Sequence, residues 1–169
     1  PSIVSRSTDM PCKLCIAVEC CVFVAADKSS LKNKVEACLM ETLDGSCPSL
    51  SSSHGIIGDW DTSNVEDMTE MFNGAALFNA DLSKWQSGKV TNMKNMFYGA
   101  ALFTGDLSKW QTGNVTTMSF MFYLSRVFNS DLSKWDVAKV NDLTYAFSTT
   151  KFNSDLSKWQ TLSLQKLYA

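Results

Sequence analysis

Residues 106–122 read DLSKWQTGNVTTMSFMF, and close variants of this phrase recur along the C-terminal two-thirds of the chain. The tryptophans of the series are separated by 25 residues, except for the last step of 24 residues: Trp60, Trp85, Trp110, Trp135 and Trp159. A fixed period of this length is typical of repeat proteins, in which each copy stacks on the next. The phrase therefore predicts a repeat architecture for the segment after residue 55.

Two different spacings alternate within one copy. Val90, Met93 and Phe97 recur at the spacing of one helix face, which predicts a short helix, and Gly99 fits the left-handed residue that ends a helix. The Asp-Leu-Ser-Lys-Trp stretch alternates polar and apolar residues, as a strand with one buried face does. Each copy is thus expected to contain one strand and one helix.

A unit this small cannot bury its apolar face alone, so stacked copies are expected to share a core. The predicted fold class is an α/β repeat, a leucine-rich-repeat-like solenoid of 25-residue strand-helix coils with a parallel β ladder, preceded by a helical N-terminal cap. Besides the five tryptophans, the expected core ladder contains the repeated leucines Leu82, Leu107, Leu132 and Leu156.

The stretch from Leu107 to Met118, together with Met121-Phe122, resembles the BspA-type leucine-rich repeat surface-protein family. The resemblance extends over residues 55–169. It implies a leucine-rich-repeat-like solenoid, extracytoplasmic placement and a role in adhesion or protein binding. It carries over no catalytic residue.

The N-terminal part has a different composition, because it holds all six cysteines: Cys12, Cys15, Cys20, Cys21, Cys38 and Cys47. An even number of cysteines in a short segment indicates disulfides and an oxidising compartment, although the Cys12-x-x-Cys15 spacing leaves a metal site open. Residues 11–26 are apolar, and Ser29 or Ser30 is expected to begin a second helix that runs to about Leu43. These features predict a disulfide-stapled helical hairpin that caps the stack; a weaker, half-length saposin-like interpretation would imply lipid contact.

The expected domain organisation follows from these shifts in composition. Residues 1–48 form the Cys-rich cap, 49–55 a Ser-rich linker and 56–169 the repeats. The individual copies span about residues 60–84, 85–109, 110–134, 135–158 and, in part, 159–169.

Composition and motifs argue against several functional classes. A net charge of −2 provides no basic field for nucleic acid, and the longest apolar run, 15–26, is too short to span a bilayer, which leaves only membrane-surface contact. The single histidine, His54, lies in the Ser-rich stretch, and no catalytic triad, phosphate loop or metalloprotease motif occurs. We therefore expect neither an enzyme nor a cofactor. Since the chain begins at Pro1 without a recognisable signal peptide, we expect a processed product.

Repeated polar positions are the candidate interaction sites. An aspartate column (Asp81, Asp106, Asp131 and Asp155) runs beside a lysine column (Lys84, Lys109, Lys134 and Lys158). Stacked carboxylates repel, so either local hydrogen bonds and lysine pairing offset the repulsion or a cation such as calcium binds. The last partial copy, with Leu164, Leu167 and Tyr168, is expected to leave an exposed apolar end that docks a partner. Asn114-Val115-Thr116 is a glycosylation sequon.

These observations predict a non-enzymatic protein–protein interaction or scaffold subunit within a larger assembly. The expected setting is extracytoplasmic: the cell surface, a secreted protein, or an organelle lumen such as the thylakoid lumen. An accessory subunit of a membrane-associated complex is one such role. The alternatives are binding of a cation or small ligand by the aspartate column, or a surface adhesin.

Overall fold

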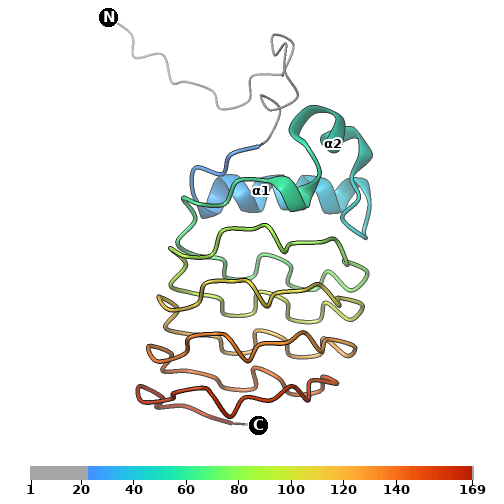
Figure 1. The fold of residues 1–169 in the computed structure, drawn as a ribbon. Coiled ribbons are helices and arrows are strands. Elements are labelled where there is room, and N and C mark those ends of the chain that lie inside the picture. The colour runs from blue at the N-terminus through green and yellow to red at the C-terminus, as the bar shows by residue number, and fades with distance from the viewer. Residues whose placement is uncertain (1–22, 169) are drawn as a thin grey trace, which may run out of the picture.

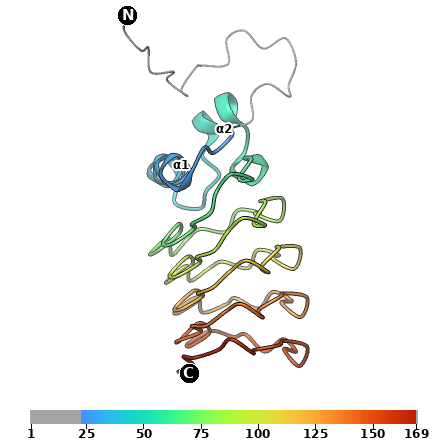
Figure 2. The same cartoon turned by 90° about the vertical axis from the view of Figure 1, so that its left-hand side faces the viewer.

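The computed structural model describes residues 23–168 and consists of a helical end followed by a stack of coils (Figure 1). The helical end contains helix α1 (Lys28–Glu41), helix α2 (Pro48–His54) and the short 3₁₀ helix η2 (Ile57–Asp59). From Trp60 onward the described chain winds back and forth in layers, and the view turned by 90° shows the same layered stack from the side (Figure 2).

The predicted fold class is wrong. Residues 23–168 contain no strand, and neither a helix nor a sheet occurs between residue 60 and residue 168. Within the described residues, the β-bridges between neighbouring coils are isolated parallel ones, at Asp67↔Asn92, Asn92↔Thr117, Thr117↔Asp142 and Asp142↔Lys166. The chain is therefore not an α/β solenoid with a parallel β ladder.

The helix expected over the valine, methionine and phenylalanine positions is prevented by a left-handed residue within each copy. The backbone φ is +54° at Asn95, and equivalent residues of the other coils also have positive φ. A left-handed residue cannot continue a right-handed helix. Instead, Met96 N–H donates to Met93 O in a tight turn (3.3 Å), while Phe97 N–H donates to Met121 O of the next coil (2.9 Å). Spacing that is typical of a helix is thus satisfied by turns.

The Asp-Leu-Ser-Lys-Trp stretch is also a turn rather than a strand. In residues 106–110 the Asp106 carboxylate accepts the Ser108 N–H at 2.9 Å, and Trp110 N–H donates to Leu107 O at 3.1 Å. Aspartate side chains commonly stabilise turns by accepting a backbone N–H two residues on. Leu107 and Trp110 therefore reach the core from the two ends of a tight turn.

The core lies between the two long sides of each coil and is built from columns of identical side chains. Phe72, Phe97 and Phe122 stack with ring centroids 5.3 and 5.5 Å apart and interplanar angles of 8° and 3°. The Trp110 indole N–H donates to Leu82 O of the preceding coil at 3.1 Å, so its polar atom is satisfied while the ring is buried. Burying one such side chain contributes roughly 1.5–3 kcal/mol, which makes these columns the main source of stability.

Helix α1 covers the first coil. Its N-cap is Asp27, whose side chain accepts Ser30 N–H while the Ser30 side chain accepts the Asp27 N–H; the expected cap, Ser29 or Ser30, was therefore misplaced. Leu31 and Val35 point into the core and are fully buried. The helix ends at Glu41, and Cys38 near its end forms a disulfide with Cys47.

Helix α2 occupies the stretch expected to be a Ser-rich linker. Pro48 stands in its first turn, where a missing N–H is tolerated, and the Glu41 carboxylate accepts the backbone N–H groups of Ser49 and Leu50. Together with the disulfide, these bonds tie α2 to the end of α1. The expected partner helix over residues 11–26 lies almost wholly outside the described residues.

Candidate functional site: the open face of the last coil

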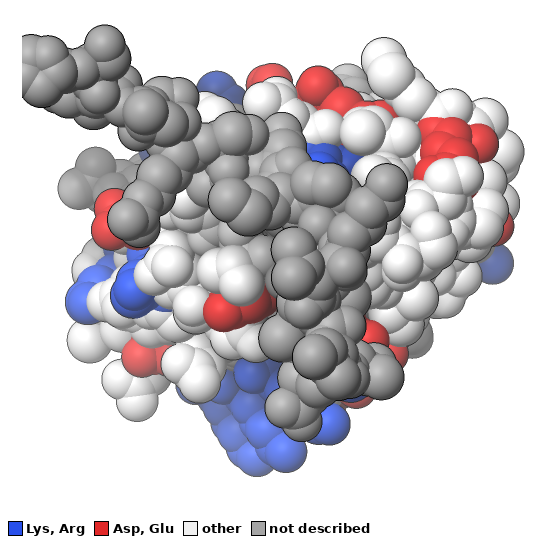
Figure 3. Space-filling model, turned by 90° about the horizontal axis from the view of Figure 1, so that it is seen from above, with Lys and Arg blue, Asp and Glu red and all other residues white. Residues whose placement is uncertain are grey.

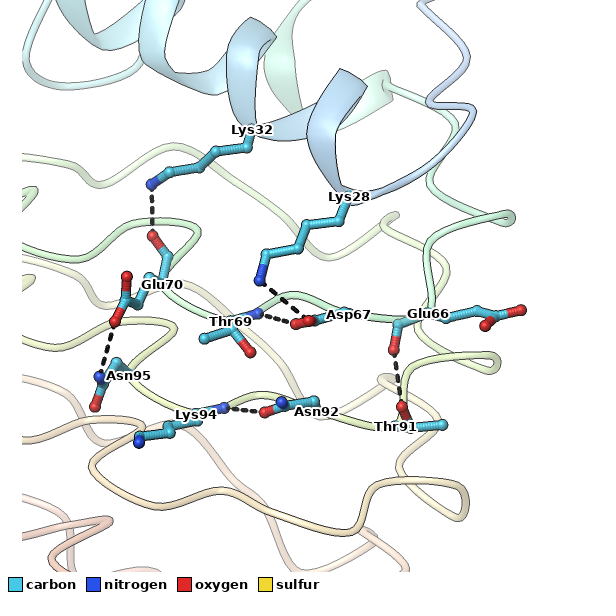
Figure 4. A network of polar contacts seen from close by, with 10 residues as sticks. All are labelled: Lys28, Lys32, Glu66, Asp67, Thr69, Glu70, Thr91, Asn92, Lys94 and Asn95. Atoms are coloured by element: carbon cyan, nitrogen blue, oxygen red, sulfur yellow. Dashed lines mark hydrogen bonds and ion pairs between the residues drawn. The ribbon is translucent and has the colours of Figure 1, made fainter.

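The N-terminal face of the coil stack is covered by polar as well as apolar contacts. Lys32 Nζ donates to Glu70 O at 2.6 Å and to Met71 O at 3.2 Å, and Lys28 Nζ pairs with the Asp67 carboxylate at 3.1 Å. Figure 4 shows both lysines reaching down from α1 to the first coil. Carbonyl groups that point away from the stack at this end therefore meet lysine donors.

The C-terminal face carries an open hollow of about 510 Å³. Its lining is mostly apolar and includes Phe147, Leu156, Trp159, Leu164, Leu167 and Tyr168. The three predicted docking residues Leu164, Leu167 and Tyr168 thus line one hollow together with Trp159. The phenylalanines, leucines and tryptophans of the interior coils, such as Phe122, Leu132 and Trp135, are fully or almost fully buried.

The backbone edge at this face is only partly paired. Leu143 N–H donates to Lys166 O at 3.0 Å and Tyr145 N–H to Tyr168 O at 2.7 Å. In the preceding coil the same pattern continues through Phe122 N–H, which donates to Ala146 O at 2.9 Å. No acceptor for the equivalent Phe147 N–H lies within residues 23–168. The last coil therefore presents an apolar hollow beside a backbone donor.

The carboxylates of the aspartate column already accept hydrogen bonds within their own turns. Asp81, Asp106, Asp131 and Asp155 each accept a serine N–H two residues on, at 2.8–2.9 Å. This backbone hydrogen bond is the main cause that lowers the pKa of each carboxyl below its ordinary value. Within the described part of the chain, no group of three or more His, Cys, Asp or Glu side chains could hold a metal ion. Cation binding by this column stays a prediction.

The lysine column is exposed along its whole length: Lys84, Lys109, Lys134 and Lys158. Lys84 Nζ donates to the Asp59 carboxylate at 2.6 Å, and this bond raises the pKa of Lys84. Seen from the N-terminal end, basic side chains gather in a ridge at one edge of the molecule (Figure 3). The polar columns therefore form a mixed, exposed surface, in which Lys84 and Lys109 also line a hollow of about 220 Å³.

The remaining predicted positions are spread over the helical end and beyond it. Cys38 and Cys47 form a disulfide, whereas the candidates Cys12, Cys15, Cys20 and Cys21 lie outside the described residues, as does Pro1. His54, expected in a solvated linker, is the last residue of α2 and is half-buried beside Ser53 and Lys34. Asn114 of the sequon is exposed and donates to Gly88 O at 2.8 Å.

One group of surface residues was missed by the sequence reasoning. Aromatic rings on the outer side of the turns contact one another from coil to coil: Tyr98, Phe120, Tyr123, Tyr145 and Tyr168. The available signal was the 25-residue spacing of Tyr98 with Tyr123 and of Phe120 with Tyr145. It was overlooked because the first copies carry polar residues there, Glu70 and Asn73.

Within residues 23–168, no helix is both long enough and apolar enough to cross a bilayer.

Comparison with known proteins corrects the family resemblance. Residues 47–159 match the protein family described as "Mycoplasma protein of unknown function, DUF285", and not the BspA-type leucine-rich repeat family. The absence of strands from residues 23–168 agrees with this correction, since the resemblance implied a leucine-rich-repeat strand in every copy. Neither the curated proteins nor the solved structures compared with the chain gave a match. Because the matched segment covers well over half of its length, the chain belongs to the DUF285 family.

Proposed function

We propose that this chain is a non-enzymatic, protein-binding scaffold and that the open face of its last coil binds the partner. The observation that carries the proposal is the apolar hollow of about 510 Å³ around Phe147, Trp159 and Leu167. Exposed apolar surface of this kind marks interaction sites, and aromatic side chains dominate the binding energy of many interfaces.

The repeat itself indicates which partner fits this face. Each interior coil face is covered by the next coil, which lays a phenylalanine on a phenylalanine, as Phe122 does on Phe97, and donates an indole N–H to a leucine carbonyl, as Trp110 does to Leu82. The last face offers Phe147 as the ring, Phe147 N–H as a backbone donor and Leu156 in the lining. We therefore assign as occupant a segment of another protein that can adopt the turns of one coil and carries tryptophan and phenylalanine at the spacing of one coil.

The proposed setting is extracytoplasmic or within an organelle lumen. Support comes from the Cys38–Cys47 disulfide, which ties the end of α1 to the start of α2. Disulfides persist mainly in oxidising compartments. A scaffold whose C-terminal face holds an apolar hollow and whose helical end is held by a disulfide suits an accessory subunit of a larger assembly.

A labelled peptide with the sequence of residues 106–130 serves as the test partner, because it contains one complete interior coil. Fluorescence anisotropy measures its binding to the chain and to two matched variants. Leu167→Asp alters the hollow, whereas Leu162→Asp makes the same change at a leucine that is 88% exposed and lies outside the lining. Both leucines are exposed, so both variants should keep the fold.

The expected result is binding to the unmodified chain and to Leu162→Asp, with affinity reduced roughly tenfold or more for Leu167→Asp. A peptide with alanine in place of Trp110 and Phe122 should bind weakly to all three proteins. Absence of binding, or equal affinity of the two variants, contradicts the proposal.

A further inference from the structure

The tryptophans of successive coils share one polar contact. In each case the indole N–H donates to a backbone carbonyl of the preceding copy, at an apolar residue that lies three positions before a tryptophan. The pairs are Trp85 with Ile57 at 2.8 Å, Trp110 with Leu82 at 3.1 Å, Trp135 with Leu107 at 2.9 Å and Trp159 with Leu132 at 2.9 Å. The contact is therefore part of the way in which one coil docks on another.

The leucine carbonyls of this series each accept two hydrogen bonds. Leu107 O accepts Trp110 N–H of its own turn at 3.1 Å and the Trp135 indole N–H of the next coil at 2.9 Å. Leu132 O accepts Trp135 N–H at 3.0 Å and the Trp159 indole N–H at 2.9 Å. A carbonyl oxygen has two lone pairs, so both are used in these coils.

The next carbonyl of the series, Leu156 O, belongs to the last face. It accepts Trp159 N–H of its own turn at 2.9 Å, but no indole N–H reaches it within residues 23–168. Because Leu132 O is directed at the following coil, the equivalent Leu156 O is directed at the open face. Leu156 and Trp159 both line the apolar hollow there. The hollow therefore contains a backbone acceptor that matches an indole donor.

A phenylalanine accompanies the tryptophan in each layer of the stack. Phe122 precedes Trp135 by 13 positions, and their ring centroids lie 6.5 Å apart. Phe122 also stacks on Phe97 of the preceding coil at 5.5 Å. On the last face, Phe147 is the ring on which the next phenylalanine of such a layer stacks. A segment that continues the stack thus needs phenylalanine and tryptophan at this spacing.

We infer that the hollow is specific for a tryptophan of the partner, whose indole N–H donates to Leu156 O while a phenylalanine 13 positions earlier stacks on Phe147. This inference rests on the proposed function, because it names the side chains that the same site recognises. Indole combines a large apolar ring with an N–H donor and has no acceptor. Phenylalanine in its place fills apolar space but leaves the carbonyl without this donor.

A labelled peptide with the sequence of residues 120–139 tests the inference, because it contains Phe122 and Trp135 at the required spacing. In a second peptide benzothienylalanine replaces Trp135, which keeps the shape of the ring but exchanges its N–H for sulfur. A third peptide carries Trp135→Phe. The matched control is Lys134→Ala, which changes an exposed neighbour of the tryptophan. Fluorescence anisotropy measures binding to the unmodified chain and to the Leu167→Asp and Leu162→Asp variants.

The unmodified and Lys134→Ala peptides should bind the chain with equal affinity. Benzothienylalanine should weaken binding roughly three- to tenfold, as expected for the loss of one hydrogen bond, and Trp135→Phe should weaken it at least as much. When the peptide carries nitrogen-15 in the indole, binding should move the indole N–H resonance downfield and slow its exchange with solvent. Leu167→Asp should weaken binding of the unmodified peptide, whereas Leu162→Asp should not.

The outcomes that overturn the inference are distinct from those that overturn the proposed function. Equal affinity of the tryptophan and benzothienylalanine peptides overturns the inference alone, since the hollow then binds its partner by apolar contact without reading the indole N–H. Absence of binding by every peptide overturns both. Equal affinity of the Leu167→Asp and Leu162→Asp variants for the unmodified peptide also overturns both, because the peptide then binds outside the hollow.

Discussion

The two ends of the coil stack present similar surfaces but differ in what covers them. At the N-terminal end, α1 buries Leu31 and Val35, and Lys32 donates to two backbone carbonyls of the first coil. At the C-terminal end, Phe147 and Trp159 border an open apolar hollow. The comparison teaches that a single coil does not satisfy its own apolar and backbone groups, so each coil face requires a cover.

The largest expected effect is the loss of stability when a tryptophan is removed, and it should be larger in a coil that is covered on both sides than in the last coil. Trp110 is 4% exposed, and its replacement by alanine should lower the free energy of unfolding by about 3–5 kcal/mol. Trp159→Ala should lower it by less, because its ring already faces the hollow. Urea denaturation measures both values; equal losses would show that the end coil is as well packed as the interior.

Weakening the packing of α1 on the first coil should have the next largest effect on stability. Leu31→Ala leaves a cavity between α1 and the first coil and should lower the free energy of unfolding by about 2–5 kcal/mol. Hydrogen exchange should accelerate most at the first coil, near Met68 and Phe72. Met40→Ala on the same helix, at a side chain that is 88% exposed, is the control and should change little.

A smaller effect on stability is expected at one turn position with positive φ. This position is glycine in the two coils nearest α1 and a larger residue in the next two coils. Gly74 and Gly99 have φ of +75° and +69°, and Leu124 and Thr149 adopt +61° at the corresponding positions. Leu124→Gly should raise stability by about 0.5–1 kcal/mol, because relief of about 1–2 kcal/mol of strain exceeds the entropic cost of glycine.

Differential scanning calorimetry detects the change as a higher melting midpoint. Leu102→Gly, at an exposed leucine without positive φ, should lower the midpoint instead. A lower midpoint for Leu124→Gly would show that its side-chain contacts outweigh the strain.

The smallest effect is the pH dependence of the aspartate turns, which recur from the first coils to the open end. Hydrogen bonds from Ser108 lower the pKa of Asp106, so folding favours its charged form. The resulting stabilisation is present above the ordinary aspartate pKa of about 3.9 and is lost as the pH falls through the lower folded-state pKa.

The melting midpoint should therefore decrease on acidification below about pH 4. Asp106→Asn keeps an oxygen that accepts the Ser108 N–H but does not titrate, so its midpoint should decrease less. An identical pH dependence of the two proteins would exclude a contribution from this turn.

Sequence patterns predicted the repeat period correctly but the backbone conformation within each copy incorrectly. The spacing of Val90, Met93 and Phe97 predicted a helix, which the structure replaces with turns because Asn95 is left-handed. The alternation in Asp-Leu-Ser-Lys-Trp predicted a strand, yet the Asp106 carboxylate closes a turn there. Both errors arise because periodicity reports which side chains face inward, whereas several backbone paths produce the same periodicity.

Of the candidate surfaces, one was predicted from the sequence and one was not. Leu164, Leu167 and Tyr168 were visible in the sequence as apolar residues of an incomplete copy, and the structure gathers them around one hollow. The ring contacts on the outer side of the turns, from Tyr98 to Tyr168, were missed, since neither these contacts nor the positive φ at Phe120 can be read from spacing alone.

The amino-acid sequence by itself determined the 25-residue period, the recurring tryptophans and the separate cysteine-rich N-terminal segment. Only the tertiary structure decided that the coils contain turns in place of strands and helices, and that, within residues 23–168, α1 covers the first coil while the face of the last coil stays uncovered. The physical reason is that backbone N–H groups donate hydrogen bonds to carbonyl groups of the next coil. Met68 N–H donates to Asn92 O at 2.9 Å, a contact that no local sequence pattern specifies.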